Sequence, residues 1–390
     1  MAKRLAYYLS HPIQYFSPLL RALSKASQLN VYYFSDNNRK GMIDAGFGQA
    51  IQWDVPLLEG YDHQFLKNVS RRSSLDNHFL DVINPGLLPS LWKTKSRVVI
   101  VNGWTYSSTL LVIFFGPLLG KKVWLRAENP LNQELEKSRK TLLLKKLLLK
   151  GILFRFVSKF LYIGEESRRF FEYYGVSPSR LVYTPYAVDN ELFQRQFGEL
   201  KDSGGRIREE LGLPADKKII LFSGKYISKK RPMDLLRAFA MLGKGDHALV
   251  MMGEGELRKE MEAYIQEHKL QEVYLTGFVN QSGISKYYTI ADVFVMCSGA
   301  GETWGLSVNE AMNFEKPVIV SRACGCCSDL VRHGENGFAF ETEDVAELAG
   351  HLKKTLEDDV FRVSAGKKSV EIINRYSIQA IVANIISALN

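Results

Sequence analysis

Short apolar runs alternate with longer segments of helical periodicity along nearly the whole chain. This rhythm predicts βαβ units and parallel sheets, because parallel strands need a crossover connection. We predict strands in the first half at 4–9, 29–34, 98–102, 122–126, 160–163 and 181–184, and in the second half at 218–223, 247–252, 272–275, 292–297 and 317–321. The pattern indicates the α/β class, with doubly wound parallel sheets.

The chain has 390 residues, which exceeds one ordinary core of about 100 to 200 residues and favours two sheets over one. The rhythm breaks between Tyr186 and Asp216, where glycine, proline and charged residues are typical of a linker or short surface helices. We therefore expect a first domain over 1–190 and a second over 191–370. The tail over 371–390 carries apolar residues at helical spacing and predicts a helix.

The most apolar run, residues 110–119, is too short for a membrane span of about 20 residues and contains Gly116 and Pro117. It predicts a buried helix. The apolar stretch at the N-terminus is also shorter than the core of a signal peptide, so secretion is not expected. The four cysteines do not form the paired Cys-x-x-Cys motifs of a zinc site, and we interpret them as reduced thiols of a cytoplasmic protein.

The net charge of +9 is uneven along the chain. Residues 1–190 hold 26 Lys and Arg against 14 Asp and Glu, whereas the rest holds 25 against 28. Such a basic half indicates an anionic partner. Within it, the segment 134–159 carries eight basic and two acidic residues interleaved with leucine, which predicts a basic amphipathic helix. Such a helix can bind an anionic membrane surface, or it can be an ordinary helix with a solvated basic face. Nucleic-acid binding is not expected, because the aromatic residues lie mostly in strands or at core spacing.

The loop after the strand at 218–223 carries the first chemical signal. The strand is followed by Gly224 and Lys225, and Lys230 comes five residues later, before a helix that starts near Pro232. Glycine allows a close approach of the backbone to a ligand, and two ammonium groups can neutralise a diphosphate. The spacing does not fit a Walker loop.

A second glycine-bearing loop follows the strand at 292–297. Glu302 lies in this loop, Gly305 opens a helix, and Glu310 lies on that helix. A loop carboxylate can bind sugar hydroxyls, a helix start can face a phosphate, and the helix carboxylate can accept a hydrogen bond from a ribose. Two carboxylates and a helix end suffice for micromolar recognition of a polyhydroxylated diphosphate.

Together these loops resemble the nucleotide-sugar-binding domain of family 4 retaining glycosyltransferases (glycosyl transferases group 1). Glu302 and Glu310 match that family's two glutamates separated by seven residues, and Lys225 with Lys230 matches its basic diphosphate clamp. Flanking stretches at 252–256, 276–279, 291–296, 315–320 and 336–338 agree, so the resemblance covers about residues 218–345.

The resemblance implies the GT-B fold, in which two Rossmann-like domains face each other across a cleft and the C-terminal helix crosses back to the first domain. Glu302, Lys230 and Lys225 would be catalytic, together with His11. The implied donor-binding residues are Gly224, Lys225, Lys230, Gly253, Gly277, Phe278, Val279, Glu302, Thr303, Trp304, Gly305, Leu306 and Glu310. The sequence contains no Asp-x-Asp motif, so we expect neither a metal ion nor a cofactor beyond the nucleotide sugar.

Polar residues that follow strands of the first half are candidates for the acceptor side, because ligands bind beyond the carboxyl ends of parallel strands. They are His11, Gln14, Asn102, Trp104, Arg126 and Glu128. The family typically has two glycines in the first loop and a histidine after a later strand, and this chain departs from that pattern. The roles of His11, Arg126 and Glu128 therefore remain alternatives.

We expect a cytoplasmic, peripheral membrane enzyme on the inner face of the plasma membrane. It would transfer a hexosyl or N-acetylhexosaminyl group from a UDP- or GDP-linked donor to a glycan or a lipid-linked acceptor in cell-surface polysaccharide biosynthesis. The alternatives are a soluble synthase that glycosylates a sugar phosphate or small molecule, and a non-catalytic nucleotide-sugar-binding protein.

Overall fold

The computed structural model describes residues 3–36, 43–44, 49–50, 54–71, 75 and 78–390. The chain divides into two compact units. The first comprises the described parts of Met1–Met42 and Val55–Tyr186 together with Ile378–Asn390. The second comprises Ala187–Ser377 together with the short antiparallel ladder of β3 (Ile43–Asp44) and β4 (Gln49–Ala50).

The first unit is built on a seven-stranded parallel sheet with the order β5-β2-β1-β6-β7-β8-β9. Its strands are β1 (Arg4–Leu9), β2 (Gln28–Tyr33), β5 (His63–Phe65), β6 (Val98–Asn102), β7 (Lys122–Ala127), β8 (Lys159–Tyr162) and β9 (Leu181–Tyr183). The central strands are buried along almost their whole length, as expected for a parallel sheet covered on both faces. The order reverses between β1 and β6, which is the switch point of this sheet.

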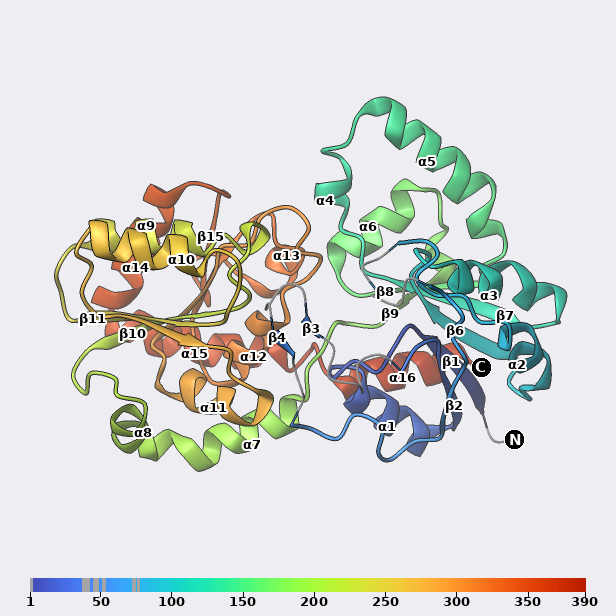
Figure 1. Ribbon diagram of the computed structural model, residues 1–390, viewed down its shortest axis with the longest axis horizontal. Coiled ribbons are helices and arrows are strands. Elements are labelled where there is room, and N and C mark those ends of the chain that lie inside the picture. The colour runs from blue at the N-terminus through green and yellow to red at the C-terminus, as the bar shows by residue number, and fades with distance from the viewer. Residues whose placement is uncertain (1–2, 37–42, 45–48, 51–53, 72–74, 76–77) are drawn as a thin grey trace. The chain divides into compact units, whose positions relative to one another are not determined.

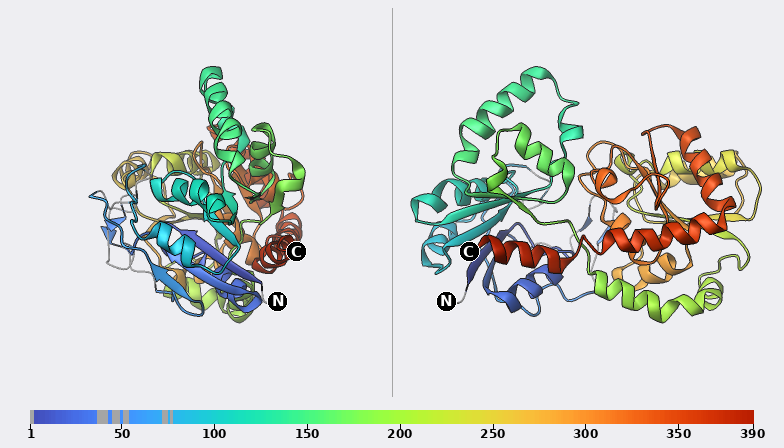
Figure 2. Two further views of the ribbon diagram at one scale, coloured as in Figure 1. Left: turned by 90° about the vertical axis from the view of Figure 1, so that its right-hand side faces the viewer. Right: turned by 180° about the vertical axis from the view of Figure 1, so that it is seen from behind.

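Helices cover both faces of this sheet (Figure 1). They are α1 (Ser17–Ala26), α2 (Leu87–Lys93), α3 (Ser107–Leu118), α4 (Leu131–Glu134), α5 (Arg139–Gly151), α6 (Glu165–Tyr173) and α16 (Ile378–Ala388), with 3₁₀ turns η2 (Leu153–Arg155) and η3 (Pro178–Arg180). The helices α2, α3, α5 and α6 each lie in a connection that leads toward the β9 edge of the sheet. Because such crossovers are right-handed, these four helices lie on one face. The connection α1 runs the opposite way, and α16 packs beside α1 (Figure 2).

The second unit has a six-stranded parallel sheet with the order β12-β11-β10-β13-β14-β15. Its strands are β10 (Lys218–Ser223), β11 (His247–Met252), β12 (Val273–Gly277), β13 (Val293–Met296), β14 (Val318–Ser321) and β15 (Gly337–Phe340). Its helices are α7 (Asn190–Leu200), α8 (Gly204–Glu210), α9 (Pro232–Leu242), α10 (Arg258–Glu267), α11 (Gln281–Ile290), α12 (Leu306–Asn313), α13 (Cys327–Leu330), α14 (Val345–Glu357) and α15 (Asp359–Ile373), with 3₁₀ turns η4 (Lys201–Ser203) and η5 (Ser228–Lys230). The strand order reverses between β10 and β13, so this pair forms the switch point.

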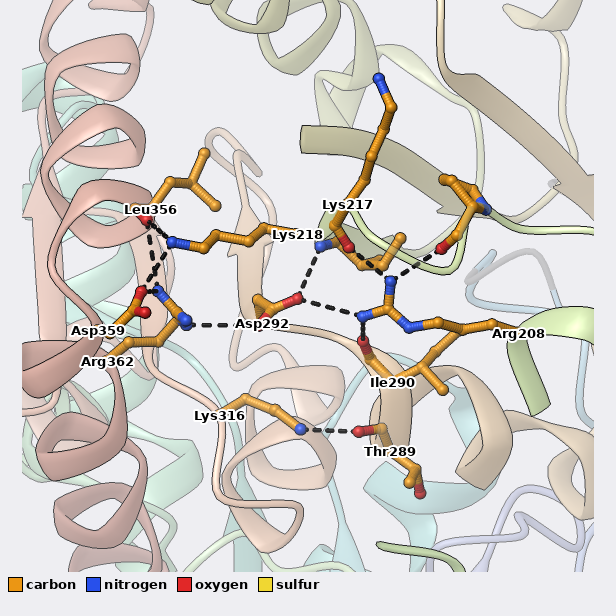
Figure 3. A network of polar contacts seen from close by, with 12 residues as sticks. Arg208, Lys217, Lys218, Thr289, Ile290, Asp292, Lys316, Leu356, Asp359 and Arg362 are labelled. Carbon is orange, nitrogen blue, oxygen red and sulfur yellow. Dashed lines mark hydrogen bonds and ion pairs between the residues drawn. The ribbon is translucent and has the colours of Figure 1, made fainter. Parts of the chain in front are cut away.

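A polar network anchors the amino edge of the second sheet (Figure 3). Asp292, just before β13, accepts a hydrogen bond from the backbone N–H of Ile219 on β10 (2.8 Å) and pairs with Arg208 of α8 and Arg362 of α15 (3.5 and 3.3 Å). The ammonium group of Lys316 lies in the same region and donates to the Thr289 carbonyl (2.9 Å). The network holds helices against the edge opposite to the strand ends where ligands bind.

The stretch over 186–216, predicted as a linker or short surface helices, contains the two helices α7 and α8, and α7 begins at the predicted domain boundary. Two other sequence predictions differ from the structure. The helix at 110–119 is buried only on one side, because Leu118 is 74% exposed. The basic helix predicted over 134–159 is shorter, since α5 spans Arg139–Gly151 and the flanking residues fall in α4, η2 and β8.

Candidate active site

The loop after β10 places several lysines at the switch point of the second sheet. Gly224 follows the strand and its backbone N–H donates to the Met252 carbonyl of β11 (3.0 Å). Lys225 follows Gly224, and η5 ends at Lys230. Arg231 then adopts a left-handed conformation (φ 51°) directly before Pro232, where α9 starts. Proline suits the first helical position because its missing N–H has no partner there in any case.

Close backbone packing joins the ends of β10, β11 and β12. Gly253, directly after β11, donates its backbone N–H to the Gly277 carbonyl (2.9 Å). A Cβ atom on Gly253 would lie 1.9 Å from the Gly224 carbonyl oxygen, so only glycine fits there. Gly277 has φ 76° and ends β12, and Phe278 and Val279 follow it half-buried. The predicted glycines 224, 253 and 277 therefore lie side by side.

Glu302 lies in the loop after β13 and contacts the lysines of the β10 loop. Its carboxylate is hydrogen-bonded to the Lys230 ammonium group, and the side chains of both residues are mostly buried. Lys229 stands at 3.9 Å from the same carboxylate and donates to the Gly301 carbonyl (3.3 Å). The backbone N–H of Gly299 donates to the Lys229 carbonyl (2.9 Å), which fixes the two loops together.

Helix α12 begins at this loop and carries the second glutamate. Gly305 adopts φ 110° before Leu306, the first helical residue, and no described side chain caps the helix start. The Glu310 carboxylate is buried and accepts a hydrogen bond from the Tyr288 hydroxyl of α11 (2.8 Å). Trp304 is also buried, and its indole N–H donates to the Asn309 side-chain oxygen (2.8 Å).

A cysteine-rich turn after β14 packs against the Glu302 loop and is hydrogen-bonded to its backbone. The backbone N–H groups of Gly325 and Cys326 donate to the carbonyls of Glu302 and Trp304 (3.1 and 3.2 Å). A Cβ atom on Gly325 would lie 1.9 Å from the Thr303 carbonyl oxygen. The four cysteines are buried free thiols, and burial raises the pKa of the Cys327 thiol to about 11. These thiols are therefore packing groups of the loop support and not nucleophiles at neutral pH.

In the first unit, the switch point lies where β1 and β6 end. The His11 ring nitrogen Nδ1 and the Ser10 hydroxyl are 3.0 Å apart just beyond β1. The Tyr7 hydroxyl donates to the side-chain oxygen of Asn102, the last residue of β6 (2.9 Å). Burial lowers the pKa of His11 to about 4, so its imidazole is neutral near pH 7. His11 can therefore accept or donate one hydrogen bond but does not supply a cation there.

Arg126 and Glu128 form the charged pair of this edge. The Arg126 guanidinium is buried and lies 2.8 Å from the Glu128 carboxylate. It also stacks over the rings of Phe16 and Tyr186, at 4.8 and 4.7 Å from their centroids. Burial lowers the pKa of Arg126, but the combined effect of Glu128, Tyr7 and Tyr186 is larger, so the pKa is raised overall. The guanidinium is a fixed positive charge that orients Glu128.

The other two predicted acceptor-side residues have different surroundings. Trp104 stacks on Phe170 of α6 (centroids 6.1 Å apart) and packs against the core of the first unit. Gln14 lies half-buried between β1 and α1. Trp104 is thus mainly a packing residue, whereas His11, Asn102, Arg126 and Glu128 gather at the carboxyl edge.

The structure therefore brings the predicted donor residues together in the second unit and describes the acceptor-side residues separately in the first. Sequence reasoning missed Lys229, Tyr288 and Asn309. Lys229 was visible in the Lys-Lys-Arg run at 229–231, but its contact with a loop 72 residues away was not. Tyr288 carries no motif that marks it as a partner of Glu310.

Among the residues that the structure describes, no group of three or more His, Cys, Asp or Glu side chains is arranged to hold a metal ion. None of the helices in the described ranges combines the length and apolar character needed to span a bilayer.

Comparison with known proteins agrees with this geometry. Residues 205–378 match the family model described as Glycosyl transferases group 1, and this span contains both loops of the candidate site. This segment belongs to the glycosyl transferases group 1 family. The predicted family resemblance is thus confirmed.

Two curated relatives match about half of the chain. The D-inositol 3-phosphate glycosyltransferase of Thermomonospora curvata is 31% identical over 207 residues, which cover 50% of this chain and 48% of that protein. The sulfoquinovosyl transferase of Arabidopsis thaliana is 29% identical over 201 residues, which cover 51% of this chain and 37% of that protein. The chain thus spans about half or less of the length of these relatives.

Solved structures match nearly the whole chain in fold. HepE of Anabaena, in complex with UDP and glucose, superimposes with a TM-score of 0.73 at 18% identity and covers 99% of both chains. The sucrose-phosphate synthase of Thermosynechococcus elongatus gives a TM-score of 0.68 at 18% identity, with 99% of this chain and 98% of that one covered. Two parallel-sheet Rossmann-like domains give this chain the predicted GT-B fold.

Proposed function

We propose that this protein is a retaining glycosyltransferase that takes a hexosyl or N-acetylhexosaminyl group from a UDP- or GDP-linked donor. The observation that carries the proposal is the contact between Lys230 and Glu302 at the switch point of the second sheet. It joins a basic loop and a carboxylate at the place where open parallel sheets bind ligands. The same span matches a glycosyltransferase family, and HepE was solved with UDP and glucose.

The charge of the β10 loop suits a diphosphate. Lys225, Lys229 and Lys230 supply three ammonium groups, and Glu302 neutralises only part of that charge. A bound diphosphate would share Lys230 with Glu302 and add charge-assisted hydrogen bonds, which are worth about 1.5 to 3 kcal/mol each. The start of α12, which no side chain in the described part of the chain caps, would face the same group with its backbone N–H groups and its positive dipole end.

In the proposed reaction, the bond between the anomeric carbon of the sugar and the phosphate oxygen breaks, and its electron pair leaves with the nucleoside diphosphate. An acceptor hydroxyl forms the new bond on the same face of the sugar, and its proton passes to the departing phosphate. The lysines stabilise the developing negative charge, which is the largest need of this step. We propose on this ground that the reaction needs no divalent cation.

Glu302 and Glu310 would position the donor. Glu302 is held near the ammonium of Lys230, so its carboxylate can accept hydrogen bonds from sugar hydroxyls next to the leaving diphosphate. Glu310 is fixed by Tyr288 on the second turn of α12, where it can accept from the ribose. Gly277 ends β12 beside Gly253 and Phe278 follows it, and the backbone of both residues would meet the base.

We propose a glycan or lipid-linked acceptor at an anionic membrane surface, in cell-surface polysaccharide biosynthesis. Helix α5 supports this choice, because Leu143, Leu144 and Leu147 are exposed beside basic residues. Lys145 does not belong to that basic surface, since it pairs with the buried Glu134 carboxylate at 2.6 Å. The peripheral attachment and the cytoplasmic location remain part of this proposal.

A sugar phosphate or small molecule is the second candidate acceptor. It is favoured by the similarity to the D-inositol 3-phosphate glycosyltransferase of Thermomonospora curvata. In that case the basic charge of the first unit would bind the acceptor's phosphate, and the protein would not need a membrane.

The test is turnover of UDP- and GDP-sugars with lipid-linked glycans and with sugar phosphates, without added metal and with a chelator present. We expect release of the nucleoside diphosphate and a product with the anomeric configuration of the donor, by NMR. Glu302→Gln should abolish turnover, while Glu343→Gln, an exposed glutamate paired with Arg231 at 2.7 Å, serves as the matched control. Donor binding without turnover on any acceptor would favour the non-catalytic alternative.

A further inference from the structure

A second exposed apolar surface lies on the first unit, away from α5. Trp92 at the end of α2 is 78% exposed and Leu118 at the end of α3 is 74% exposed. Leu88 on α2, Phe115 on α3 and Leu119 directly after α3 are also exposed. Helices α2 and α3 contact each other, and the Lys121 ammonium after α3 donates to the Thr94 carbonyl after α2 (2.7 Å). We call these five apolar residues the α2–α3 patch.

Exposed basic residues lie at one end of the α2–α3 patch. Lys93, Lys95, Arg97 and Lys122 are all exposed and lie at the ends of α2 and α3, where β6 and β7 begin. The sequence between Asp81 and Glu128 contains no acidic residue at all. The patch therefore combines exposed tryptophan and leucine with positive charges that no acidic residue of this segment offsets. It lies at the amino edge of the sheet, whereas His11 and Asn102 lie at the carboxyl edge.

We propose that the α2–α3 patch inserts into the interface of an anionic lipid bilayer. Large exposed apolar side chains on a soluble unit mark a contact surface. Tryptophan is favoured at the level of lipid headgroups, and lysine and arginine beside it are attracted to anionic lipids. The positive charge of the patch is complementary to an anionic lipid surface. The exposed side chains of Trp92 and Leu118 would insert into that surface, whereas a partner that binds through charge alone would leave them in water.

The position of α5 agrees with this partner. The crossover rule places α2, α3 and α5 on the same face of the first sheet. The ring of Phe114 on α3 packs edge-on against Phe156 after η2, with centroids 5.0 Å apart, which joins the C-terminal end of the α5 segment to α3. The α2–α3 patch and α5 would then both contact the bilayer, and two contacts would fix the orientation of the first unit on the membrane. This inference rests on the membrane attachment in the proposed function and adds a second surface to it, and it does not depend on enzymatic activity.

The experiment is co-flotation of the full chain with phosphatidylcholine vesicles with and without phosphatidylglycerol. Trp92→Ser and Leu118→Ser should each weaken binding to the anionic vesicles about tenfold, the loss expected for removing one inserted apolar side chain. The control is Val360→Ser on α15 of the second unit, where the valine is 82% exposed and should not contribute. All three positions are exposed, so thermal unfolding should confirm that the variants stay folded.

A fluorescence measurement locates the inserted residue. Vesicles with brominated lipid should quench the emission of the unmodified protein more than that of Trp92→Phe, and the difference isolates Trp92. Equal flotation of Trp92→Ser, Leu118→Ser and unmodified protein would overturn the proposal, as would equal quenching with and without Trp92. Leu147→Ser separates the two surfaces: if only this variant loses binding, α5 binds lipid and the α2–α3 patch does not.

Discussion

The pair Lys230 and Glu302 offers a way to separate a structural contact from a role in binding. Their side chains are 17% and 10% exposed, so Lys230→Met would leave a mostly buried carboxylate whose nearest other ammonium is that of Lys229, at 3.9 Å. An unsatisfied charged group of this kind costs about 1 to 3 kcal/mol. We expect Lys230→Met to lower the free energy of unfolding by about 2 kcal/mol, and Glu302→Gln by about 1 kcal/mol.

The double variant should separate the two effects. With both charges removed, the double variant has no unpaired buried charge at this site. Its loss of stability should therefore be at least about 1 kcal/mol smaller than the sum of the two single losses. Donor affinity should not recover, because a diphosphate still lacks Lys230. A lost charge-assisted hydrogen bond of about 1.5 to 3 kcal/mol corresponds to a dissociation constant raised about 10- to 150-fold.

The assays are urea unfolding at pH 7 and calorimetric titration with UDP- and GDP-sugars. The double variant should bind the donor no more tightly than Lys230→Met, although its loss of stability is smaller than the sum of the two single losses. Arg237→Met on α9 is a matched control, because this arginine is about half exposed and faces Asp234 rather than Glu302. Recovery of donor affinity in the double variant would refute the reasoning, because Lys230 would then matter only as a partner of Glu302.

Three further predictions concern stability and pH. Burial lowers the pKa of Lys316 from 10.5 to about 8, so the unfolded chain binds more protons between these values. The free energy of unfolding should therefore rise by up to about 3 kcal/mol from pH 8 to 10.5, and Lys316→Met should not show this rise. Urea unfolding measures it, and the same change with pH in the variant and the unmodified protein would contradict the prediction. Gly253→Ala should destabilise by about 2 kcal/mol or more, because its Cβ would lie 1.9 Å from the Gly224 oxygen, whereas Gly198→Ala on α7 has open space and should not. Since burial lowers the pKa of His11 to about 4, the activity ratio of His11→Gln to unmodified protein should stay constant from about pH 5.5 to 8, and a ratio that changes near 6.5 would show an ordinary histidine.

The sequence was sufficient for most of the sheet but not for its edges. β10 and β11 were predicted at their observed bounds, because continuous apolar runs bounded by turn residues are typical of buried parallel strands. β5 and β15 were missed. β5 has only three residues and β15 begins at a glycine, so neither run is long enough to show a period. Their strand character comes from pairing with β2 and β14.

The site residues were predictable as types, but not their contacts. Lys230 and Glu302 could be chosen because each follows a buried strand. Their contact depends on β10 and β13 being neighbours, although β11 and β12 lie between them in the sequence. The basic helix shows the same limit: Lys145 looked like a surface lysine, but a buried carboxylate 11 residues earlier accepts its hydrogen bond.

The most direct test of the central claim is to map where a photoreactive UDP- or GDP-sugar attaches, by mass spectrometry of the labelled full chain. We expect labelled peptides from the β10 loop at 224–231 and the β13 loop at 298–310, with labelling suppressed by excess unmodified donor and weakened in Lys230→Met. Suppressible labelling confined to peptides outside Ala187–Ser377 would contradict the assignment of the donor to the second unit.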